Sequence, residues 1–591
     1  MKSRWIAFLS ITCLLAACHV SEEDPLEKDQ GPQPDVVTVD LQRDVAPSPD
    51  LPTPDLGVDQ GVDVGIDFRE IPKDLGPDKD RVPPQVASTG PADKATGVVL
   101  RRKLWATFTK AMDPATATPT SFLLKTHGVS IPPAKVTSSG DTAFFTPAFP
   151  FCPLTTYSAT VTTAFTDLQK NALPADYTWS FTTADGAWDT PLVWTVAEPR
   201  VTGALAQNGD AFLAFTEAGH VKVATYSASV GIWSLRVQVD KATTTTAWSP
   251  IIAADAMGNA LVAWQQGTSR DVYVARYDAK THVWQQTPTS LETSTEKVLD
   301  GPMVAMSPTG QAMVVYLQNV TVSGTTTRTA FYNLYDGTTW SVRKAIPDGG
   351  DAPYQDIRVV SDGIGGFVVA WRARSTSSVS SLRSNVYDGV AKTWKMTSAV
   401  EVGKPVASWA PFSLAASPVG AAAAWAVHVK SGNERIYAAR YDKSTWTTVV
   451  DISKNTSGYA TNAQVAIGLT GKVYAAWNVG VTGGGVRLAS FTAANGWGAV
   501  TSVTTDRGEG LSLALDIAGN GHLVWFDTKT GRLRGARLLA GVLGAPAWLS
   551  PARQGWAEGT TLSVNACGQG LFVAGYENEG PYSSPDVLLF H

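Results

Sequence analysis

The sequence predicts an all-β protein in which a disordered tether leads to a small β-sandwich and then to a β-propeller. Short apolar and Thr-rich runs alternate with turn signals throughout the chain. Charged residues make up 17% of the 591 residues, below the roughly 25% of ordinary soluble proteins, and there are 52 glycines and 35 prolines. Finally, an aromatic pattern recurs every 48 to 55 residues in the last two thirds of the chain. Together these features are typical of an exported, turn-rich β protein.

The first 17 residues have the pattern of an export signal. Lys2 and Arg4 precede an apolar run that is too short to cross a bilayer core of about 30 Å. The run ends in Leu15-Ala16-Ala17-Cys18, which resembles the bacterial lipobox. That resemblance implies a lipoprotein signal peptide at 1–17 and a diacylglycerol thioether on Cys18, with palmitate or similar acyl chains that anchor the protein stably in a membrane. The alternative is an ordinary secretory signal that happens to contain Cys18.

The residue after the lipidated cysteine indicates a location. His19, and not Asp, follows Cys18, which by resemblance to the enterobacterial sorting rule favours the outer membrane. The sequence does not decide between the periplasmic and the outer face.

Residues 18–82 have the composition of a disordered acidic tether. Residues 19–82 contain 17 Asp and Glu but only 6 Lys and Arg, among frequent Pro and Gly. Such a segment cannot bury enough apolar surface to offset its ordering entropy, so we expect a solvated spacer. Weak calcium binding is the alternative, although the calcium-loop pattern D-x-[DN]-x-[DN]-G is missing. No region is basic enough for nucleic-acid binding.

Residues 83–184 have the strand pattern of a small sandwich, with several runs of four to eight Thr, Val, Phe and Tyr residues. Four stretches resemble a bacterial Ig-like domain family common in S-layer and other surface proteins: Pro83–Val98, Ala106–Phe122, Phe145–Thr162 and Tyr177–Thr183. The resemblance implies that Tyr157, Trp179 and Phe181 are core residues. The family's D-x-x-G-N turn appears here as Asp167–Asn171 without its glycine, which leaves the local turn open.

Residues 185–591 contain eight quasi-repeats. Each unit has an aromatic residue at the end of an apolar strand: Phe215, Trp264, Tyr316, Trp371, Trp425, Trp477, Trp525 and Tyr576. A second Trp follows a Tyr or Phe in six units, at 233, 284, 340, 394, 446 and 497, and Trp548 is assigned to the seventh. A period near 51 residues with four short strands is typical of a β-propeller blade. The count favours eight blades, with seven as the alternative.

The two ends of this region are predicted to complete one blade together. The eighth unit stops at His591 after its third strand, whereas the region begins with a Trp188-bearing strand that has no first three. We interpret the recurring aromatic residues as core between blades, and not as a ligand cage.

Chemistry-bearing motifs are scarce. The seven histidines form no metal-ligand spacing, and there is no nucleophile elbow, P-loop or dinucleotide fingerprint. Asp255 and Asp516 occupy equivalent turns and are predicted to cap them. Cys152 and Cys567 fall in different predicted domains, so we expect two buried free thiols and no bridge. The sequence therefore predicts no catalytic residue, no metal and no cofactor.

The long connections between second and third strands are predicted to form a recognition face, because a rigid scaffold tolerates variation in its binding loops. This face would carry five cations, Arg270, Arg372, Arg374, Lys430 and Arg435. We therefore expect a monomeric binding, adhesion or envelope-assembly protein whose partner is an anionic glycan or an envelope protein. The alternative is a propeller-based glycan-processing enzyme, either a sialidase-like hydrolase or a lyase.

Overall fold

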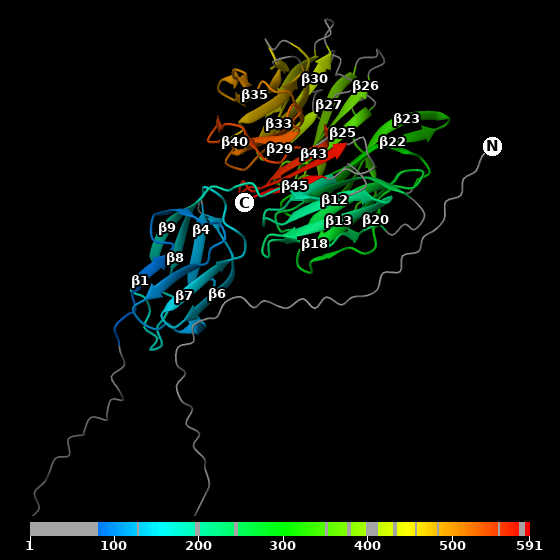
Figure 1. The fold of residues 1–591 in the computed structure, drawn as a ribbon. Helices are drawn as coiled ribbons and strands as arrows, with labels where there is room; N and C mark the ends of the chain where they lie inside the picture. The colour runs from blue at the N-terminus through cyan, green and yellow to red at the C-terminus, as the bar shows by residue number, and fades with distance from the viewer. Residues whose placement is uncertain are drawn as a thin grey trace, which may run out of the picture. The chain divides into compact units, whose positions relative to one another are not determined.

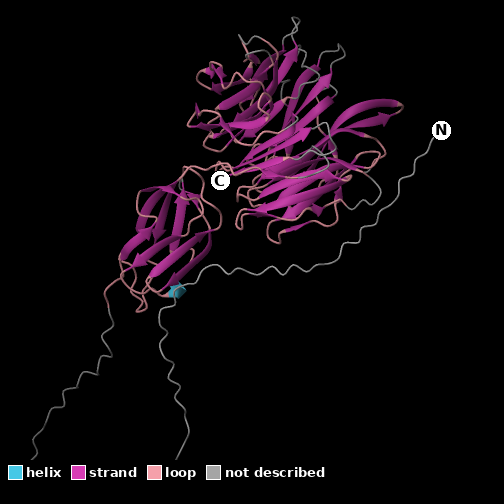
Figure 2. Cartoon of the chain, viewed as in Figure 1, coloured by secondary structure: helices cyan, strands magenta, loops and turns pink. Residues whose placement is uncertain are grey.

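The computed structural model is built almost wholly of β-strands, with one short 3-10 turn at Pro114–Thr116 among the described residues (Figure 2). The structure describes residues 81–591 except 127–128, 195–200, 241–245, 293, 349–352, 375–379, 397–411, 429–433, 455–457, 481–483, 554–555 and 578–584. The predicted signal peptide, Cys18 and the tether lie outside the described residues.

The first domain is a two-sheet sandwich, as predicted (Figure 1). One sheet consists, in spatial order, of β1 (Val86–Gly90), β3 (Leu104–Phe108), β7 (Thr142–Pro147) and β6 (Pro133–Ser139). The other consists of β2 (Ala95–Val98), β9 (Tyr177–Thr183), β8 (Thr156–Val161), β4 (Phe122–Thr126) and β5 (Val129–Ser130). Alternate residues of β3 and β8 are buried, so each of these strands turns one face to the core.

The predicted core residues of this domain are confirmed. Tyr157, Trp179 and Phe181 are all buried in one aromatic cluster. The buried hydroxyl of Tyr157 accepts the backbone N–H of Cys152 at 2.8 Å, and burial raises the pKa of Tyr157 to about 12. The turn without its glycine is nevertheless formed. The Asp167 carboxylate accepts the N–H groups of Gln169 and Asn171, and Lys170 takes the positive φ, 70°.

The second domain contains eight sheets, numbered here 1 to 8 by the order of their first strands along the chain. Sheets 1 to 4 consist of β11 (Val201–Leu205), β12 (Ala211–Glu217), β13 (His220–Ser227), β14 (Ile232–Trp233); β16 (Ala247–Ala254), β17 (Ala260–Gln266), β18 (Asp271–Asp278), β19 (Val283–Trp284); β21 (Val298–Met306), β22 (Ala312–Val322), β23 (Thr325–Tyr335), β24 (Lys344–Ala345); and β25 (Pro353–Ser361), β26 (Phe367–Arg374), β27 (Ser380–Asp388), β28 (Thr393–Met396).

Sheets 5 to 8 repeat this antiparallel order. They consist of β29 (Ser413–Ser417), β30 (Gly420–His428), β31 (Glu434–Tyr441), β32 (Val450–Asp451); β33 (Ala460–Ile467), β34 (Val473–Val479), β35 (Gly485–Thr492), β36 (Gly496–Trp497); β38 (Gly508–Leu515), β39 (Gly521–Asp527), β40 (Arg532–Leu539), β41 (Val542–Leu543); and β43 (Trp556–Val564), β44 (Gly570–Glu577), β45 (Asp586–Phe590), β10 (Leu192–Val193). Short extra strands, β15 (Val237–Gln238), β20 (Thr289–Ser290), β37 (Thr501–Ser502) and β42 (Ala547–Trp548), pair with the third strands of sheets 1, 2, 6 and 7.

The sheets form a closed ring, which is the arrangement of a β-propeller. The first strand of each sheet contacts the first strands of its two neighbours, and β43 of sheet 8 contacts β11 of sheet 1. Figure 1 shows the red C-terminal strands beside β12. Second strands lie between neighbouring sheets, and all seven residues of β17 are buried. This explains why the second strands are continuous apolar runs and do not alternate.

The ring is closed by the strand that precedes sheet 1 in sequence, as predicted. Leu192 pairs with Val587, and Trp188 pairs with Phe590 in an isolated bridge. The N–H groups of Ala187 and Asp189 donate to the carbonyl groups of His591 and Leu589 at 2.9 and 2.8 Å. The segment therefore supplies the missing fourth strand of sheet 8.

The prediction that the recurring aromatic residues are core is confirmed for the second strands, whereas among the second Trp residues two are buried, Trp284 and Trp446, and four are half-buried, Trp233, Trp340, Trp394 and Trp497. The eight second-strand aromatic residues are each no more than 1% exposed and pack between neighbouring sheets. The second Trp pairs with the aromatic residue of the third strand, as Tyr277 does with Trp284. The assignment of Trp548 to this role in sheet 7 is wrong. Leu538 pairs with Leu543 at that position, and Trp548 lies in β42 with 46% of its surface exposed.

The closure predicts a sensitive backbone position. Ala187→Pro together with Asp189→Pro removes the two N–H donors to His591 and Leu589, so we expect the free energy of unfolding of the propeller to fall by about 2 kcal/mol or more. Thr190→Pro is the control, because no hydrogen bond is formed by its N–H in the described structure. Urea unfolding followed by tryptophan fluorescence compares the variants, and equal midpoints would show that the ring does not depend on this strand.

A buried histidine next to the closure predicts acid sensitivity. His522 in β39 packs against Trp188 and Phe590, and its Nε2 accepts a 2.9 Å hydrogen bond from Arg537. Burial, assisted by the Arg537 charge, lowers the pKa of His522 to about 3. The folded protein therefore resists protonation of His522, whereas the unfolded chain takes up this proton below about pH 6.5, so this stability is lost as the pH falls from there toward 3. Between pH 7 and 5 we expect wild type to lose about 2 kcal/mol more than His522→Gln in denaturant titrations.

Candidate functional site

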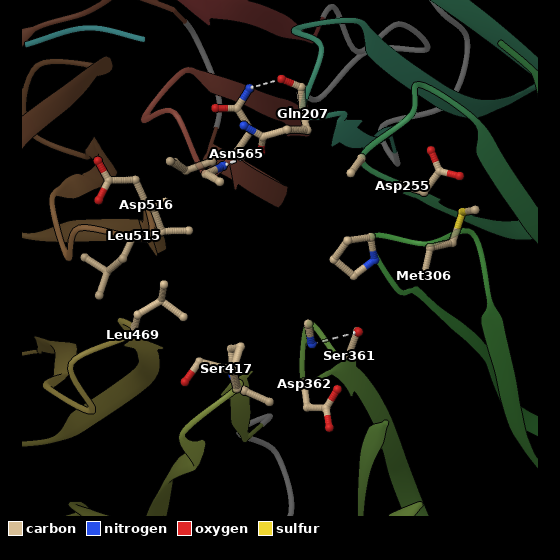
Figure 3. A pocket seen from close by; sticks show the side chains of 18 of the residues that line it. Gln207, Asp255, Met306, Ser361, Asp362, Ser417, Leu469, Leu515, Asp516 and Asn565 are labelled. Carbon is tan, nitrogen blue, oxygen red and sulfur yellow. Dashed lines mark hydrogen bonds between the residues drawn. The ribbon is translucent and has the colours of Figure 1, made fainter. Parts of the chain in front are cut away.

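A cavity lies where the eight first strands end. Its volume is about 430 Å³, and residues of all eight sheets line it (Figure 3). Apolar residues at or next to the ends of seven first strands form part of its wall: Leu205, Ala254, Met306, Ala416, Ile467, Leu515 and Val564. The cavity is therefore a product of the whole ring and belongs to no single repeat.

The turn that follows each first strand forms the rim of the cavity. In seven sheets this turn has five residues, and the N–H of the first residue donates to the carbonyl of the fifth, as in Asp255–Asn259 and Asp516–Asn520. Gly258 and Gly519 occupy the fourth position with φ of 87° and 82°, which side chains rarely adopt. The Asp255 carboxylate accepts the N–H groups of Met257 and Asn259. The prediction that Asp255 and Asp516 cap their turns is therefore confirmed.

The rim between sheets 8 and 1 is sealed by hydrogen bonds. Gln207 Oε1 accepts the N–H of Ala566 at 2.8 Å, and the Asn565 side-chain amide donates to the carbonyl of Ala206 at 3.1 Å. Figure 3 shows Gln207 and Asn565 on the same side of the cavity. These contacts join the last turn to the first at the mouth.

The polar lining of the cavity is acidic. Asp255, Asp362 and Asp516 line it, and no Lys or Arg is among the lining residues that the structure describes. Burial raises the pKa of Asp516, while the bonds from Asn520 oppose that shift. Apolar walls with a few carboxylates suit a ligand group that combines an apolar stem with a positive charge.

Three of the five predicted cations, Arg270, Arg372 and Arg435, have described side chains, and they belong to three different sheets. Arg270 lies in the hairpin between β17 and β18, with its guanidinium carbon 5.9 Å from the centre of a Trp248 ring. Arg435 lies in β31 of sheet 5 and donates to the carbonyl of Ser453 at 3.4 Å. The side chain of Arg374, the last residue of β26, and the whole of Lys430 lie outside the described residues. Whether this set binds a ligand stays a prediction.

Arg372 requires a correction. The sequence placed it in a loop, but it lies within β26, is 2% exposed and forms an ion pair with Asp356. Burial lowers the pKa of Arg372, and the Asp300 charge opposes that shift. The strand continues further than its composition indicated, so the Arg372 side chain lies near Asp356 of its own sheet and is affected by the charge of Asp300 in sheet 3. One of the long connections expected between second and third strands, Leu317–Thr329, is also mostly strand, because β22 and β23 extend through it as a projecting hairpin (Figure 1).

The cavity lies at the end of the ring opposite to the predicted recognition face. In an antiparallel sheet, the turn after the first strand and the connection after the second strand are at opposite ends. Sequence reasoning followed loop length and so selected the second connection. The signal for the cavity was present in the repeats, because a short or apolar side chain precedes the turn in almost every unit, but only closure of the ring brings these positions together.

The two remaining cysteines form a disulfide, which overturns the expectation of free thiols. Cys152 and Cys567 are bonded across 415 residues of sequence, with 4.6 Å between their Cα atoms. Thr183, the last residue of β9, donates its hydroxyl to the carbonyl of Cys152 at 2.7 Å. Five residues later the chain enters sheet 8 at Trp188, and Cys567 lies in the turn between β43 and β44 of that same sheet. We expected no bridge because the two cysteines belong to different domains. The short linker explains why they can nevertheless pair.

This bond can be tested directly. Peptide mapping of the unreduced protein should yield one cross-linked species containing Cys152 and Cys567, which separates on reduction. Because a disulfide restricts the unfolded chain, Cys152→Ser with Cys567→Ser should lower the free energy of unfolding by about 2–4 kcal/mol. Quantitative alkylation of both thiols in the unreduced native protein, with no cross-linked peptide, would contradict the assignment.

No group of three or more His, Cys, Asp or Glu side chains among the described residues is placed to hold a metal ion. Within the same residues, no helix is long and apolar enough to cross a membrane.

A known protein family and several solved structures resemble parts of this chain. Residues 80–183 match the bacterial Ig-like domain family. No curated protein sequence matches the chain. Solved structures similar to it include a protein of unknown function from Dyadobacter fermentans, with 11% identity over 67% of this chain and 94% of that one and a TM-score of 0.33. The Dos1 propeller shares 10% identity over 68% of this chain and 94% of that one, with a TM-score of 0.40. A six-bladed β-propeller lectin of Aleuria aurantia that recognises fucose shares 13% identity over 53% of this chain and 97% of that one, with a TM-score of 0.30.

Proposed function

We propose that this protein is a non-catalytic binding protein of the cell envelope, anchored in the outer membrane through a lipid on Cys18. The lipobox-like segment and the acidic, Pro-rich stretch that follows it support an anchored domain pair on a spacer. Ig-like domains commonly space or present other domains, and here the propeller is the domain with a large concave surface.

The binding site in this proposal is the central cavity. One observation carries it: residues from all eight sheets converge on a single concavity with apolar walls and a few carboxylates. A pocket of that character is the default binding site of a protein whose function is not established. Its position on a rigid ring also keeps the geometry fixed before a ligand arrives.

The cavity favours a protein partner over an anionic glycan. An anionic glycan would enter a cavity whose lining includes Asp255, Asp362 and Asp516 and, among the described residues, no Lys or Arg to pair with it. A protein segment that inserts a basic side chain would place its methylene stem on the apolar wall and its charge near those carboxylates. The glycan remains the ligand expected for the opposite face around Arg270.

The proposal is tested by locating the partner on the ring. A photo-crosslinking amino acid at Ile517, which lines the cavity and is 50% exposed, should give protein adducts in envelope preparations. Ala416→Trp, which fills part of the cavity, should abolish these adducts, whereas Arg270→Ala should leave them unchanged. Adducts only from a crosslinker at position 270, or binding on a glycan array that Arg270→Ala abolishes, would move the site to the opposite face.

A further inference from the structure

The joint between sheets 4 and 5 departs from the repeat in two ways. The first concerns the capping carboxylate. In sheet 2, one oxygen of Asp255 accepts two backbone N–H groups, and the other accepts the side-chain amide of Asn259 at 2.7 Å. The same arrangement recurs in sheet 7, where Asn520 donates to Asp516. In both turns the carboxylate is occupied by its own turn.

In sheet 4 the corresponding carboxylate is that of Asp362, and only one of its two oxygens accepts hydrogen bonds from the turn. Asp362 Oδ1 accepts the N–H groups of Ile364 and Gly366 at 2.9 and 2.8 Å. The fifth residue is Gly366, so no side-chain amide is present, and a Cβ there would collide with Asp362 Oδ2. Within the described residues Oδ2 therefore has no hydrogen-bond donor, although it shares the negative charge of the group.

The second departure is the length of the next turn. Sheet 5 has a four-residue turn in which Ser417 pairs directly with Gly420, whereas the other seven sheets have five residues. Beside this shorter turn lies a second cavity of about 250 Å³ between sheets 4 and 5. Asp362 and Ser417 line both cavities, so the two cavities adjoin each other. We call it the side cavity.

Besides Asp362, the polar lining of the side cavity consists of Ser417, the paired Asp388 and Lys395, and Lys443. Val368 and Val386 form an apolar wall, with Tyr387 and Tyr441 beside them. Lys395 forms an ion pair with Asp388 at 2.8 Å, which lowers the pKa of Asp388 to about 2.

At the outer end of the side cavity, the carbonyl of Lys443 accepts the Tyr441 hydroxyl at 3.0 Å, and the Lys443 side chain is exposed. Asp362 Oδ2 is thus the acceptor left open at the junction of the two cavities.

We propose that the side cavity binds a primary ammonium group carried on an apolar stem, with the ammonium on Asp362 Oδ2. A charge-assisted hydrogen bond to this carboxylate would be stronger than a neutral one, and the tyrosine rings can add a favourable contact with the cation. The stem lies against Val368 and Val386. This inference rests on the proposed function, because it names the chemical group that the same ligand would insert. A single ammonium site would also fix the orientation of that ligand in a ring of similar repeats.

The source of the ammonium is either a lysine side chain of a protein segment or a free amine. Two probes represent them: the blocked peptide acetyl-Gly-Gly-Lys-Gly-Gly-amide and 2-phenylethylamine. The uncharged alcohol 2-phenylethanol is the matched control ligand. Saturation-transfer NMR titrations with the full chain should show binding of one or both amines, about tenfold tighter than the alcohol. Whichever amine binds more tightly identifies the source, and binding of neither would overturn the proposal.

Two matched substitutions test the carboxylate. Asp362→Asn keeps an acceptor for the turn but removes the charge, so we expect amine binding to weaken about tenfold or more. Asp255→Asn makes the same change in a turn whose second oxygen is already occupied, and should leave amine binding unchanged. Equal effects of the two substitutions would show that general negative charge, and not this site, attracts the amine.

A one-residue insertion separates this inference from the proposed function. Adding a threonine after Pro418 restores the five-residue length of the turn and should close the side cavity, with loss of amine binding. Adduct formation at Ile517 reports the central cavity independently. Amine binding that survives the insertion in a protein with unchanged melting would overturn the side cavity alone. Loss of crosslinking in wild type, with amine binding intact, would overturn only the protein partner at the central cavity.

Discussion

Antiparallel pairing between residues 187–193 and β45 is the contact on which the propeller depends. Each sheet buries its second strand only because another sheet lies on either side, so the ring must be complete for the apolar runs to leave water. The last sheet has three strands from the C-terminal end, and without the fourth its outer edge would be open. Closure also creates the central cavity, since its wall needs all eight first strands.

Local patterns in the sequence were enough to predict most of this architecture. Tyr277 and Trp284 are seven residues apart and pair across a tight turn, so their spacing recurs wherever that turn recurs. Trp188 could be assigned to the last sheet because it matched the fourth-strand pattern at a place where three strands were missing. Asp255 and Asp516 could be read as turn caps because the donors to them lie two and four residues away.

The features that the sequence did not predict depend on contacts between residues that are distant in the chain. Arg372 looked like a loop cation because its charge and the serines after it masked a strand. Its burial is compensated by the ion pair with Asp356 of the neighbouring strand and by the charge of Asp300. The Cys152–Cys567 bond depends on how soon the chain enters sheet 8 after leaving β9. The open oxygen of Asp362 depends on a glycine four residues later, a small departure that matters only when the eight turns are compared side by side.

The disulfide also determines how the protein would carry a mechanical load. A force pulling on the Ig-like domain while the cavity holds a partner reaches sheet 8 by two routes, through the linker after Thr183 and through the Cys152–Cys567 bond. The linker route ends on the two-residue strand β10, which could be peeled from β45 one hydrogen bond at a time. The covalent route bypasses that strand and delivers the load to the turn between β43 and β44, next to the innermost strand. Tension on the Ig-like domain would thus be shared between the short strand β10 and a covalent bond.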